Sequence, residues 1–544
     1  MLNKKIFIQN LVLLIIGVLC FALAHPTDLC NSGLPFLSYF AFIPIFLLTQ
    51  RASWKTVWLY GFAYGTLCYC VFVSWLATFN PASMPVIAGM YGLYLMITFP
   101  LMKGISVLFP KYKAFVQWIV WCAYEYIKTL GFSGFHYGVT AYSHWKFVPF
   151  IQAASIIGVF GLSAILTFPS AWITAVITDK AETWKKRILN HKISACVWLF
   201  VYVACLICGF VSQKDYSNYE TRTVALIQTN TDPWVGGEES YKKDLDTLMR
   251  LSDEALESNS EISFVVWPET AFIPRIQWHY EKRQNRNSFI LVNTLLEYID
   301  SKDVSFVIGN DDGTMGYDSE GKYTLLDYNA ALVFTPKENV IPPEPEKYRK
   351  MHLVPFTEHF PFKKQLPFVY KLLEENDTHF WEKGTEPVVF EIDGLKFSVP
   401  ICFEDTFGYI GRRFVNAGAR AFVNMSNDAW AKSRACQLQH LSMAVFRSVE
   451  NRVPTVRATA SGETVIIDPN GKITASIKPF EENYLVGTIP LIKDYEPTLY
   501  TRFGDYAGVF FIFLAIGLLI FGSVKKIFDH KRRGLIQGKK YGKK

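Results

Sequence analysis

Long apolar stretches constrain the fold of this 544-residue chain more than any other feature. A helix needs about 20 mainly apolar residues to cross a bilayer. Stretches of that length, or close to it, recur at about 5–23, 34–49, 54–76, 83–109, 113–130, 150–178, 191–211 and 505–523. The sequence therefore predicts a multi-pass α-helical membrane domain of about eight spans, with a long polar insert between the seventh and the eighth.

Lysine and arginine residues divide the connecting loops into two classes. Basic residues precede the first stretch and lie after the second, fourth and sixth stretches, and nine lie in the last 20 residues. The loops 24–33 and 77–82 contain none, and 131–149 contains one. Because loops rich in Lys and Arg stay in the cytoplasm, both termini are predicted to be cytoplasmic and residues 212–504 to lie outside it. Seven spans would place the basic tail on the wrong side.

These patterns predict four segments: a seven-span membrane domain at 1–211, an extracytoplasmic domain at 212–504, an eighth helix at 505–524 and a basic cytoplasmic tail at 525–544. The first stretch has lysines before an apolar core, as a signal peptide does. No small-residue cleavage site is clear and further spans follow at once, so we expect an uncleaved anchor.

Charge and cysteine usage exclude several classes of function. The net charge of +7 reflects the basic tail, and it does not indicate a nucleic-acid partner. Eight of the ten cysteines lie in the apolar part and its loops, so neither a zinc site nor a disulfide framework is expected. No phosphate-binding glycine motif is visible, and we expect no metal and no cofactor.

The insert alternates between predicted strands and helices. Buried strands are predicted at 223–227, 262–267, 304–309, 330–335, 420–424, 455–458 and 464–467, and helices at 239–258, 287–300 and 437–451. Residues 390–401 form a further predicted strand or hairpin, with Asp393-Gly394 at its turn. This alternation favours an α/β sandwich with its helices outside.

Three reactive side chains lie next to predicted strands or apolar runs. Cys402 ends the run Val-Pro-Ile-Cys, Glu269 follows Phe-Val-Val-Trp-Pro, and Lys350 precedes Met-His-Leu-Val-Pro-Phe. Each has an ordinary alternative: a buried structural thiol, a helix cap or surface ion pair, and an exposed lysine. Together they supply a nucleophile, a base that takes its proton and a cation for a developing oxyanion.

The motifs around these residues resemble the nitrilase, or carbon–nitrogen hydrolase, superfamily. Trp-Pro-Glu269, Tyr-x-Lys350-x-His-Leu-Val-Pro-Phe-x-Glu358 and Ile-Cys402-Phe-Glu404-Asp occur in that family's order and spacing. The resemblance implies an αββα sandwich at 212–504 with Glu269 as general base, Lys350 as oxyanion stabiliser and Cys402 as nucleophile.

The same resemblance implies supporting residues. Glu358 would be an additional active-site carboxylate and Glu404 a supporting one. Phe403 stands where the family often has tyrosine, and Thr357 where glycine is usual before the second glutamate. Trp234 and Asn427 would contact substrate, the latter within Asn427-Asp-Ala-Trp.

A nitrilase-like insert between seven spans and an eighth resembles the apolipoprotein N-acyltransferase family. That resemblance implies acyl transfer from a membrane phospholipid, through a thioester on Cys402, to the amino group of a diacylglyceryl-cysteine on an apolipoprotein. It implies a monomeric enzyme in the bacterial inner (cytoplasmic) membrane, with its catalytic domain on the periplasmic side. The alternatives are a membrane-tethered amidase acting on a small soluble amide, and a non-catalytic receptor or transporter; the three intact reactive residues disfavour the last.

Overall fold

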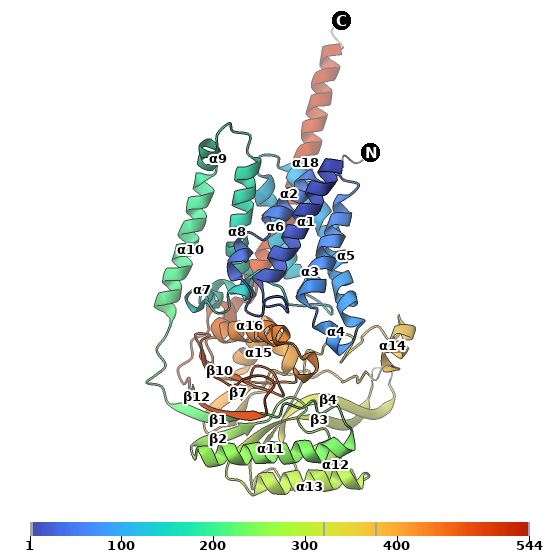
Figure 1. Cartoon of the computed structure of the whole chain (residues 1–544), viewed down its shortest axis with the longest axis vertical. Helices are drawn as coiled ribbons and strands as arrows, with labels where there is room; N and C mark the ends of the chain where they lie inside the picture. Colours follow the sequence, from blue (N-terminus) through green and yellow to red (C-terminus); the bar gives the residue numbers. More distant parts are fainter. Residues whose placement is uncertain (1–3, 319–320, 376–377, 542–544) are drawn as a thin grey trace. The chain divides into compact units, whose positions relative to one another are not determined.

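The computed structural model describes residues 4–318, 321–375 and 378–541, and side chains up to residue 531. Contacts within the chain divide it into two compact units (Figure 1). The first unit comprises Met1–Val211 and Asp505–Lys544, and the second comprises Ser212–Gly504. Each unit has its own secondary structure and core.

The first unit is helical. Among the described residues, five helices are long and apolar enough to cross a membrane: α1 (Lys4–Ala24), α5 (Ser83–Leu108), α8 (Ala154–Thr178), α10 (Lys192–Ser212) and the part of α18 (Tyr506–Tyr541) up to Lys531. A multi-pass helical domain is therefore present. The number of eight spans stays a prediction, because three of the expected spans are shorter helices.

These three helices are α2 (Ile43–Arg51), α3 (Val57–Phe72) and α6 (Lys113–Ile127). The stretch expected at 34–49 is divided into a 3-10 turn, η1 (Pro35–Tyr39), and α2. A proline stands in the first turn of each of these two elements. Because proline has no N–H group to donate and is tolerated only at a helix start, it explains the interruption that a hydropathy pattern does not register.

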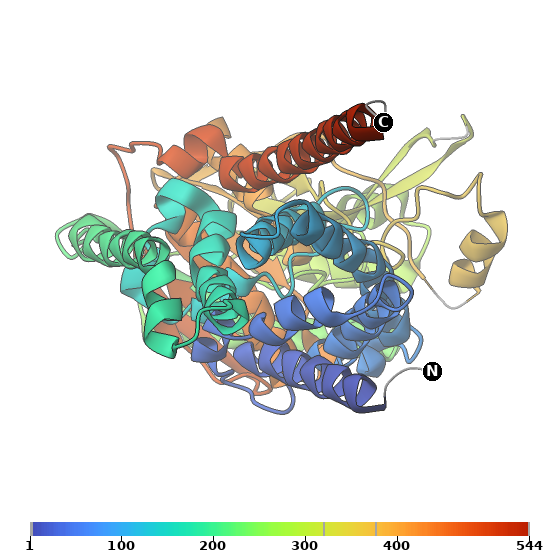
Figure 2. The ribbon, with the colours of Figure 1, turned by 90° about the horizontal axis from the view of Figure 1, so that it is seen from above.

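Close backbone contact joins α3 and α5. A Cβ atom added to Gly61 would lie 2.2 Å from the carbonyl oxygen of Leu95, and one added to Gly65 would lie 2.3 Å from that of Tyr91. Small residues of this kind let membrane helices approach each other closely. By contrast, α10 lies at one side of this unit in both views, with most of its surface exposed (Figure 2).

Two buried ionisable residues of this unit bond to other protein groups. The Lys128 ammonium, directly after α6, donates to the Tyr69 hydroxyl at 3.1 Å and to the Tyr137 carbonyl at 3.2 Å. The hydroxyl of Thr140 contacts the carboxylate of Glu125. These bonds offset part of the cost of burying charge.

The second unit contains two six-stranded sheets in its described part. The first has the order β12 (Asn483–Pro490), β1 (Thr221–Gln228), β2 (Ile262–Val266), β3 (Ser305–Tyr317), β4 (Tyr323–Phe334) and β5 (Glu346–Arg349). The second has the order β11 (Ile473–Ser476), β10 (Val465–Ile467), β9 (Thr455–Thr459), β8 (Ala421–Ser426), β7 (Leu395–Ser398) and β6 (Phe390–Ile392). Strands β1–β2–β3 and β7–β8–β9 are parallel, and their neighbours are antiparallel.

The two sheets pack face to face. The ring of Phe264 on β2 stacks on Phe397 on β7, with 5.4 Å between centroids. Helices α11 (Glu238–Ser258) and α13 (Arg286–Asp300) cover the first sheet, and α15 (Gly408–Ala417) and α16 (Arg434–Asn451) cover the second (Figure 1). This arrangement confirms the predicted α/β sandwich with its helices outside, and it is the αββα form that the family resemblance implies.

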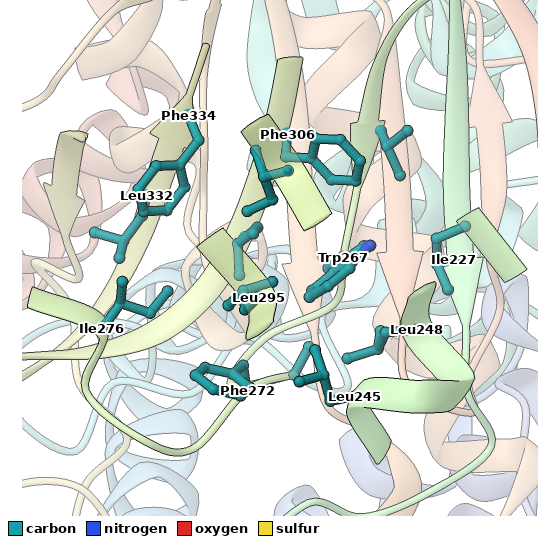
Figure 3. Close-up of a cluster of buried hydrophobic side chains, with 14 of the residues drawn as sticks. Ile227, Leu245, Leu248, Trp267, Phe272, Ile276, Leu295, Phe306, Leu332 and Phe334 are labelled. Carbon is teal, nitrogen blue, oxygen red and sulfur yellow. The ribbon is translucent and has the colours of Figure 1, made fainter. Parts of the chain in front are cut away.

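Apolar side chains fill the space between the first sheet and its helices (Figure 3). Leu245 and Leu248 of α11 and Leu295 of α13 meet Trp267, which directly follows β2. The Trp267 ring is fully buried, and its Nε1–H donates to the Ser252 hydroxyl at 2.9 Å. This packing fixes the end of β2, where Glu269 follows.

The predicted strands and helices of the insert are confirmed, with boundaries shifted by a few residues and β3 and β4 extended into a long hairpin. The sequence reasoning missed the edge strands β5, β11 and β12 and the helices α12 (Ile276–Lys282), α14 (Pro367–Glu374) and α15. β5 and β11 have four residues each, which is too few for a clear alternation of apolar and polar residues.

Candidate active site

The three predicted catalytic residues all follow the ends of strands. Glu269 comes three residues after β2, Lys350 directly after β5, and Cys402 four residues after β7. Cys402 starts a 3-10 turn, η3 (Cys402–Thr406), and has a positive φ of 48°. That left-handed conformation costs a non-glycine residue roughly 1–2 kcal/mol, so the surrounding structure must hold it.

The carboxylate of Glu269 receives three hydrogen bonds. Its Oε1 accepts from Lys350 Nζ at 3.1 Å and from Asn329 Nδ2 at 2.8 Å, and its Oε2 accepts from the backbone N–H of Asn427 at 2.9 Å. Gly309 on β3 permits this position, because a Cβ atom there would lie 2.7 Å from the Glu269 Cα. The carboxylate is buried and oriented, as a general base requires.

Lys350 is fully buried between two carboxylates. Its Nζ donates to Glu358 Oε1 at 2.8 Å as well as to Glu269. The second oxygen of Glu358 accepts from the backbone N–H of Val354 at 2.8 Å. Burial alone would lower the pKa of Lys350, but Glu269 and Glu358 raise it well above its usual value, so the side chain stays an ammonium.

The thiol of Cys402 is neutral at rest. Burial raises its pKa well above the usual value, the nearby Glu269 raises it further, and Lys350 opposes that shift. A thiolate is the nucleophilic form of cysteine. A nucleophilic role for Cys402 would therefore require a base to take its proton, and Glu269 is the carboxylate with the largest electrostatic effect on it.

Glu404 ties the two strand-end segments together. Its carboxylate accepts from the backbone N–H groups of Ile401, Met351 and His352 at 2.9, 2.8 and 2.9 Å. It also accepts from the Tyr348 hydroxyl at 2.7 Å. Burial raises the pKa of Glu404 to about 7, and these donors oppose the shift. Glu404 thus connects the backbone before Cys402 with the backbone after Lys350.

The other predicted site residues, Phe403, Asn427 and Trp234, differ in what they contact. Phe403 is buried against Phe407, with 4.9 Å between ring centroids. Asn427 bonds Glu269 through its backbone and Asp232 through its side chain, at 3.2 Å. Trp234 is 41% exposed, and its ring centroid lies 5.8 Å from that of Trp381.

Trp381 connects Trp234 with the site. Its backbone N–H donates to the Glu358 carbonyl at 3.0 Å, and its ring N–H donates to Asp311 at 3.2 Å. Of the predicted residues, the structure therefore places Glu269, Lys350, Glu358 and the backbone of Asn427 in direct contact. Trp234 is linked to them through Trp381 and through Asp232, whose Oδ1 accepts from the Trp234 backbone N–H and from the Asn427 side chain.

Known proteins resemble both units. Residues 223–495 match the carbon-nitrogen hydrolase family model, and residues 17–172 match the apolipoprotein N-acyltransferase N-terminal domain. Apolipoprotein N-acyltransferase 1 of Treponema denticola is 43% identical, over 97% of this chain and 98% of that protein. The protein of the same name in Treponema pallidum is 45% identical, over 96% of this chain and 97% of that protein.

The chain belongs to the apolipoprotein N-acyltransferase family. A relative from Borreliella burgdorferi, named apolipoprotein N-acyltransferase, is 27% identical over 89% of this chain and 90% of its own length. Among solved structures, Saccharomyces cerevisiae Nit3 of the nitrilase superfamily is 19% identical, with a TM-score of 0.35, covering 51% of this chain and 93% of that one.

Sequence reasoning missed several buried polar residues of this family member. They are Asn329, Asp405, Asp428, His440 and Arg457. Arg457 could have been recognised from the sequence, because it is a charged residue inside the otherwise uncharged strand β9. Asn329 carries no comparable signal, since its partners lie 21 and 60 residues away in the chain.

In the part of the chain that the structure describes, no group of three or more His, Cys, Asp or Glu side chains is arranged to hold a metal ion. Lys350 occupies the place beside the two glutamates that a cation would take. These side chains are of the kinds that can deprotonate a thiol and stabilise an oxyanion.

Proposed function

We propose that this chain is an acyltransferase that moves an acyl group from a membrane phospholipid to the amino group of an N-terminal diacylglyceryl-cysteine of an apolipoprotein. The observation that carries this proposal is the buried Lys350 ammonium held between Glu269 and Glu358 beside Cys402. The names of relatives that match nearly the whole chain supply the substrate class.

The first step forms a thioester. Glu269 takes the proton of the Cys402 thiol, and Sγ attacks the ester carbonyl carbon of the phospholipid. Lys350 Nζ donates to the oxyanion of the tetrahedral intermediate. The carbon–oxygen bond then breaks, Glu269 returns the proton to the leaving alkoxide, and lysophospholipid departs.

The second step transfers the acyl group. The neutral amine of the acceptor attacks the thioester carbon, and Glu269 accepts a proton from the nitrogen. The carbon–sulfur bond breaks as the intermediate collapses, and Cys402 recovers the proton. No nucleotide is required, because the donor ester already carries the acyl group. Membrane anchoring of both substrates keeps them near the thiol, which reduces the entropic cost of their encounter.

Capture of the acyl-enzyme tests this proposal. Labelled phospholipid should attach to Cys402 in the wild type and release one lysophospholipid for each thioester formed. Cys402→Ala should form none, and Cys436→Ala should form as much as the wild type, because Cys436 is a buried thiol on α16. Full acyl transfer by Cys402→Ala would exclude this mechanism.

The same experiment separates the amidase alternative. An amidase would release ammonia from a small soluble amide and would form no lysophospholipid on mixing with membranes. The carbon-nitrogen hydrolase match keeps this alternative worth testing. Mass spectrometry of lipoprotein N-termini, with and without the protein, would then identify the acceptors.

We also infer eight membrane spans, in which the segment of η1 and α2 and the helices α3 and α6 cross together with the five longer helices. Both termini would then lie in the cytoplasm and residues 212–504 on the periplasmic side of a bacterial inner membrane, as the basic loops require. A reporter active only after export should work near Ser212, and one active only in the cytoplasm should work at the C-terminus. The reverse pattern would separate the site from exported acceptors.

A further inference from the structure

A second cluster of buried charges borders Cys402. His440 of α16 lies between two carboxylates: its Nε2 is 2.7 Å from Asp405 Oδ1, and its Nδ1 is 3.3 Å from Asp428 Oδ1. Arg457 of β9 bonds Asp428 at 3.0 Å and also contacts Asp405. All four side chains are at most 3% exposed. None of them takes part in the two steps described above.

One nitrogen of this cluster reaches the nucleophile's backbone. His440 Nε2 lies 3.2 Å from the carbonyl oxygen of Cys402, as well as near Asp405. A carbonyl and a carboxylate can only accept hydrogen bonds, so Nε2 must carry a hydrogen. This conclusion holds whether the ring is neutral or protonated.

Charge balance favours the protonated ring. Asp405 and Asp428 are two buried carboxylates, and Arg457 alone neutralises one of them. Burial and Arg457 would lower the pKa of His440, but the two carboxylates raise it to about 9. Arg457 Nη2 lies 2.8 Å from Nδ1, a contact that suits a neutral ring. A protonated ring would make this cluster neutral, with two carboxylates facing two cations.

The conformation of Cys402 creates the need for such a contact. Its φ of 48° is unfavourable for a residue with a side chain, and the direction of Sγ depends on it. On the N-terminal side, Glu404 accepts the backbone N–H of Ile401. On the C-terminal side, His440 binds the carbonyl of Cys402 itself. The strained residue is thus held from both sides.

We propose that His440 is a positioning residue, whose Nε2–H holds the Cys402 carbonyl and thereby aims the thiol at the acyl carbon. This proposal rests on the proposed function, because one of its tests measures the rate of thioester formation. Asp405, Asp428 and Arg457 act through His440 in this proposal, since they orient its ring.

Two amide substitutions separate this role from general stability. In His440→Gln the side-chain N–H group can reach the place of Nε2, whereas in His440→Asn it reaches only the place of Nδ1. Both replacements are polar and uncharged. We expect His440→Asn to slow thioester formation by about 10²-fold with an unchanged KM for phospholipid, because a nucleophile misplaced by about 1 Å loses that much rate. His440→Gln should stay within about tenfold of the wild type, since it keeps the donor but loses the charge.

A phospholipid-independent measurement distinguishes the two proposals. The rate of Cys402 alkylation by iodoacetamide should fall in His440→Asn and largely recover in His440→Gln, whatever the natural substrate is. If the wild type forms no thioester but alkylation follows this order, the proposed function fails and the positioning role stands. Cys436→Ala, one helical turn earlier on α16, is the control for lost packing and should match the wild type.

The outcomes that overturn the proposal are equally defined. Equal rates for His440→Asn and His440→Gln, at temperatures where both are folded, would exclude a role for the Nε2–H donor. If His440→Asn does not fold, the test depends on His440→Gln alone. Slow thioester formation in a folded His440→Gln then contradicts the positioning role of His440.

Discussion

Two buried charge clusters border Cys402, and they differ in their balance. In the first, the single ammonium of Lys350 faces the carboxylates of Glu269 and Glu358. In the second, Asp405 and Asp428 face Arg457 and His440, whose pKa the two carboxylates raise to about 9 against burial and Arg457. With both glutamates ionised, the first cluster has a formal excess of one negative charge, although burial raises the pKa of Glu358. With His440 protonated, the second cluster is neutral.

Under the proposed roles, this difference would let one domain hold both a reactive centre and a rigid support. A carboxylate that shares its cation with another can accept a proton without leaving an unpaired charge behind. A cluster with matched charges gains nothing by moving a proton and instead holds its members in place. The first cluster is suited to proton transfer, and the second to fixing the backbone of Cys402.

The largest expected effect comes from removing the base. Glu269→Gln keeps an acceptor for Lys350 but cannot take the thiol proton, so thioester formation should slow by about 10²–10⁴-fold. Mass spectrometry of Cys402 after mixing with labelled phospholipid measures this loss. Glu391→Gln, at an exposed position on β6, is the control and should react normally. Normal thioester accumulation in Glu269→Gln would show that another group is the base.

Removing one charge from the second cluster should lower the stability of the protein. Asp428→Asn leaves the cations of His440 and Arg457 with one carboxylate, and removing one partner of a buried ion pair typically costs about 3–5 kcal/mol. Thermal unfolding in detergent should show a clear drop in Tm. Asp303→Asn breaks the exposed pair with Lys337, 3.1 Å apart, and should change Tm little. A Tm unchanged in Asp428→Asn would contradict the supporting role of the second cluster.

Removing the cation of the first cluster should reduce the rate of both steps. Lys350→Met eliminates the donor to the oxyanion, and losing one such donor costs about 10²–10³ in rate. Lys350→Arg keeps the charge but not the compact ammonium, so we expect it to be severely impaired too. Turnover and thioester yield are the measurements, with the exposed Lys396→Met as control. Near-normal turnover in Lys350→Met would exclude the oxyanion assignment.

The smallest effect is a dependence of stability on pH. The pKa of His440 is raised from 6.5 to about 9, because Asp405 and Asp428 outweigh burial and Arg457. Its contribution to the free energy of unfolding should be fully present below about pH 6.5 and be lost as the pH rises through about 9. The full loss is roughly 3 kcal/mol. The measurement is the difference in the free energy of unfolding between wild type and His440→Gln, taken at about pH 6 and at about pH 10. If this difference does not shrink as the pH rises, the ring is neutral.

The sequence was sufficient where the deciding interactions are local. An apolar strand followed by a reactive side chain identified Glu269 and Cys402, because the strand and the residue after it are neighbours in the chain. The apolar stretches likewise predicted a helical membrane unit. Hydropathy did not predict the length of each helix, since Pro35 and Pro44 interrupt one stretch that remains apolar throughout.

Only the tertiary structure decided which charges meet. Lys350 bonds Glu358, which is 8 residues away, and also Glu269, which is 81 residues away. His440 reaches Asp405 across 35 residues, and Arg457 reaches Asp428 across 29. These pairings depend on the order and register of strands in two sheets, which no local pattern records. The sequence thus determined the reactive groups, and the packing of the sandwich determined which of them lie in an unbalanced cluster and which in a balanced one.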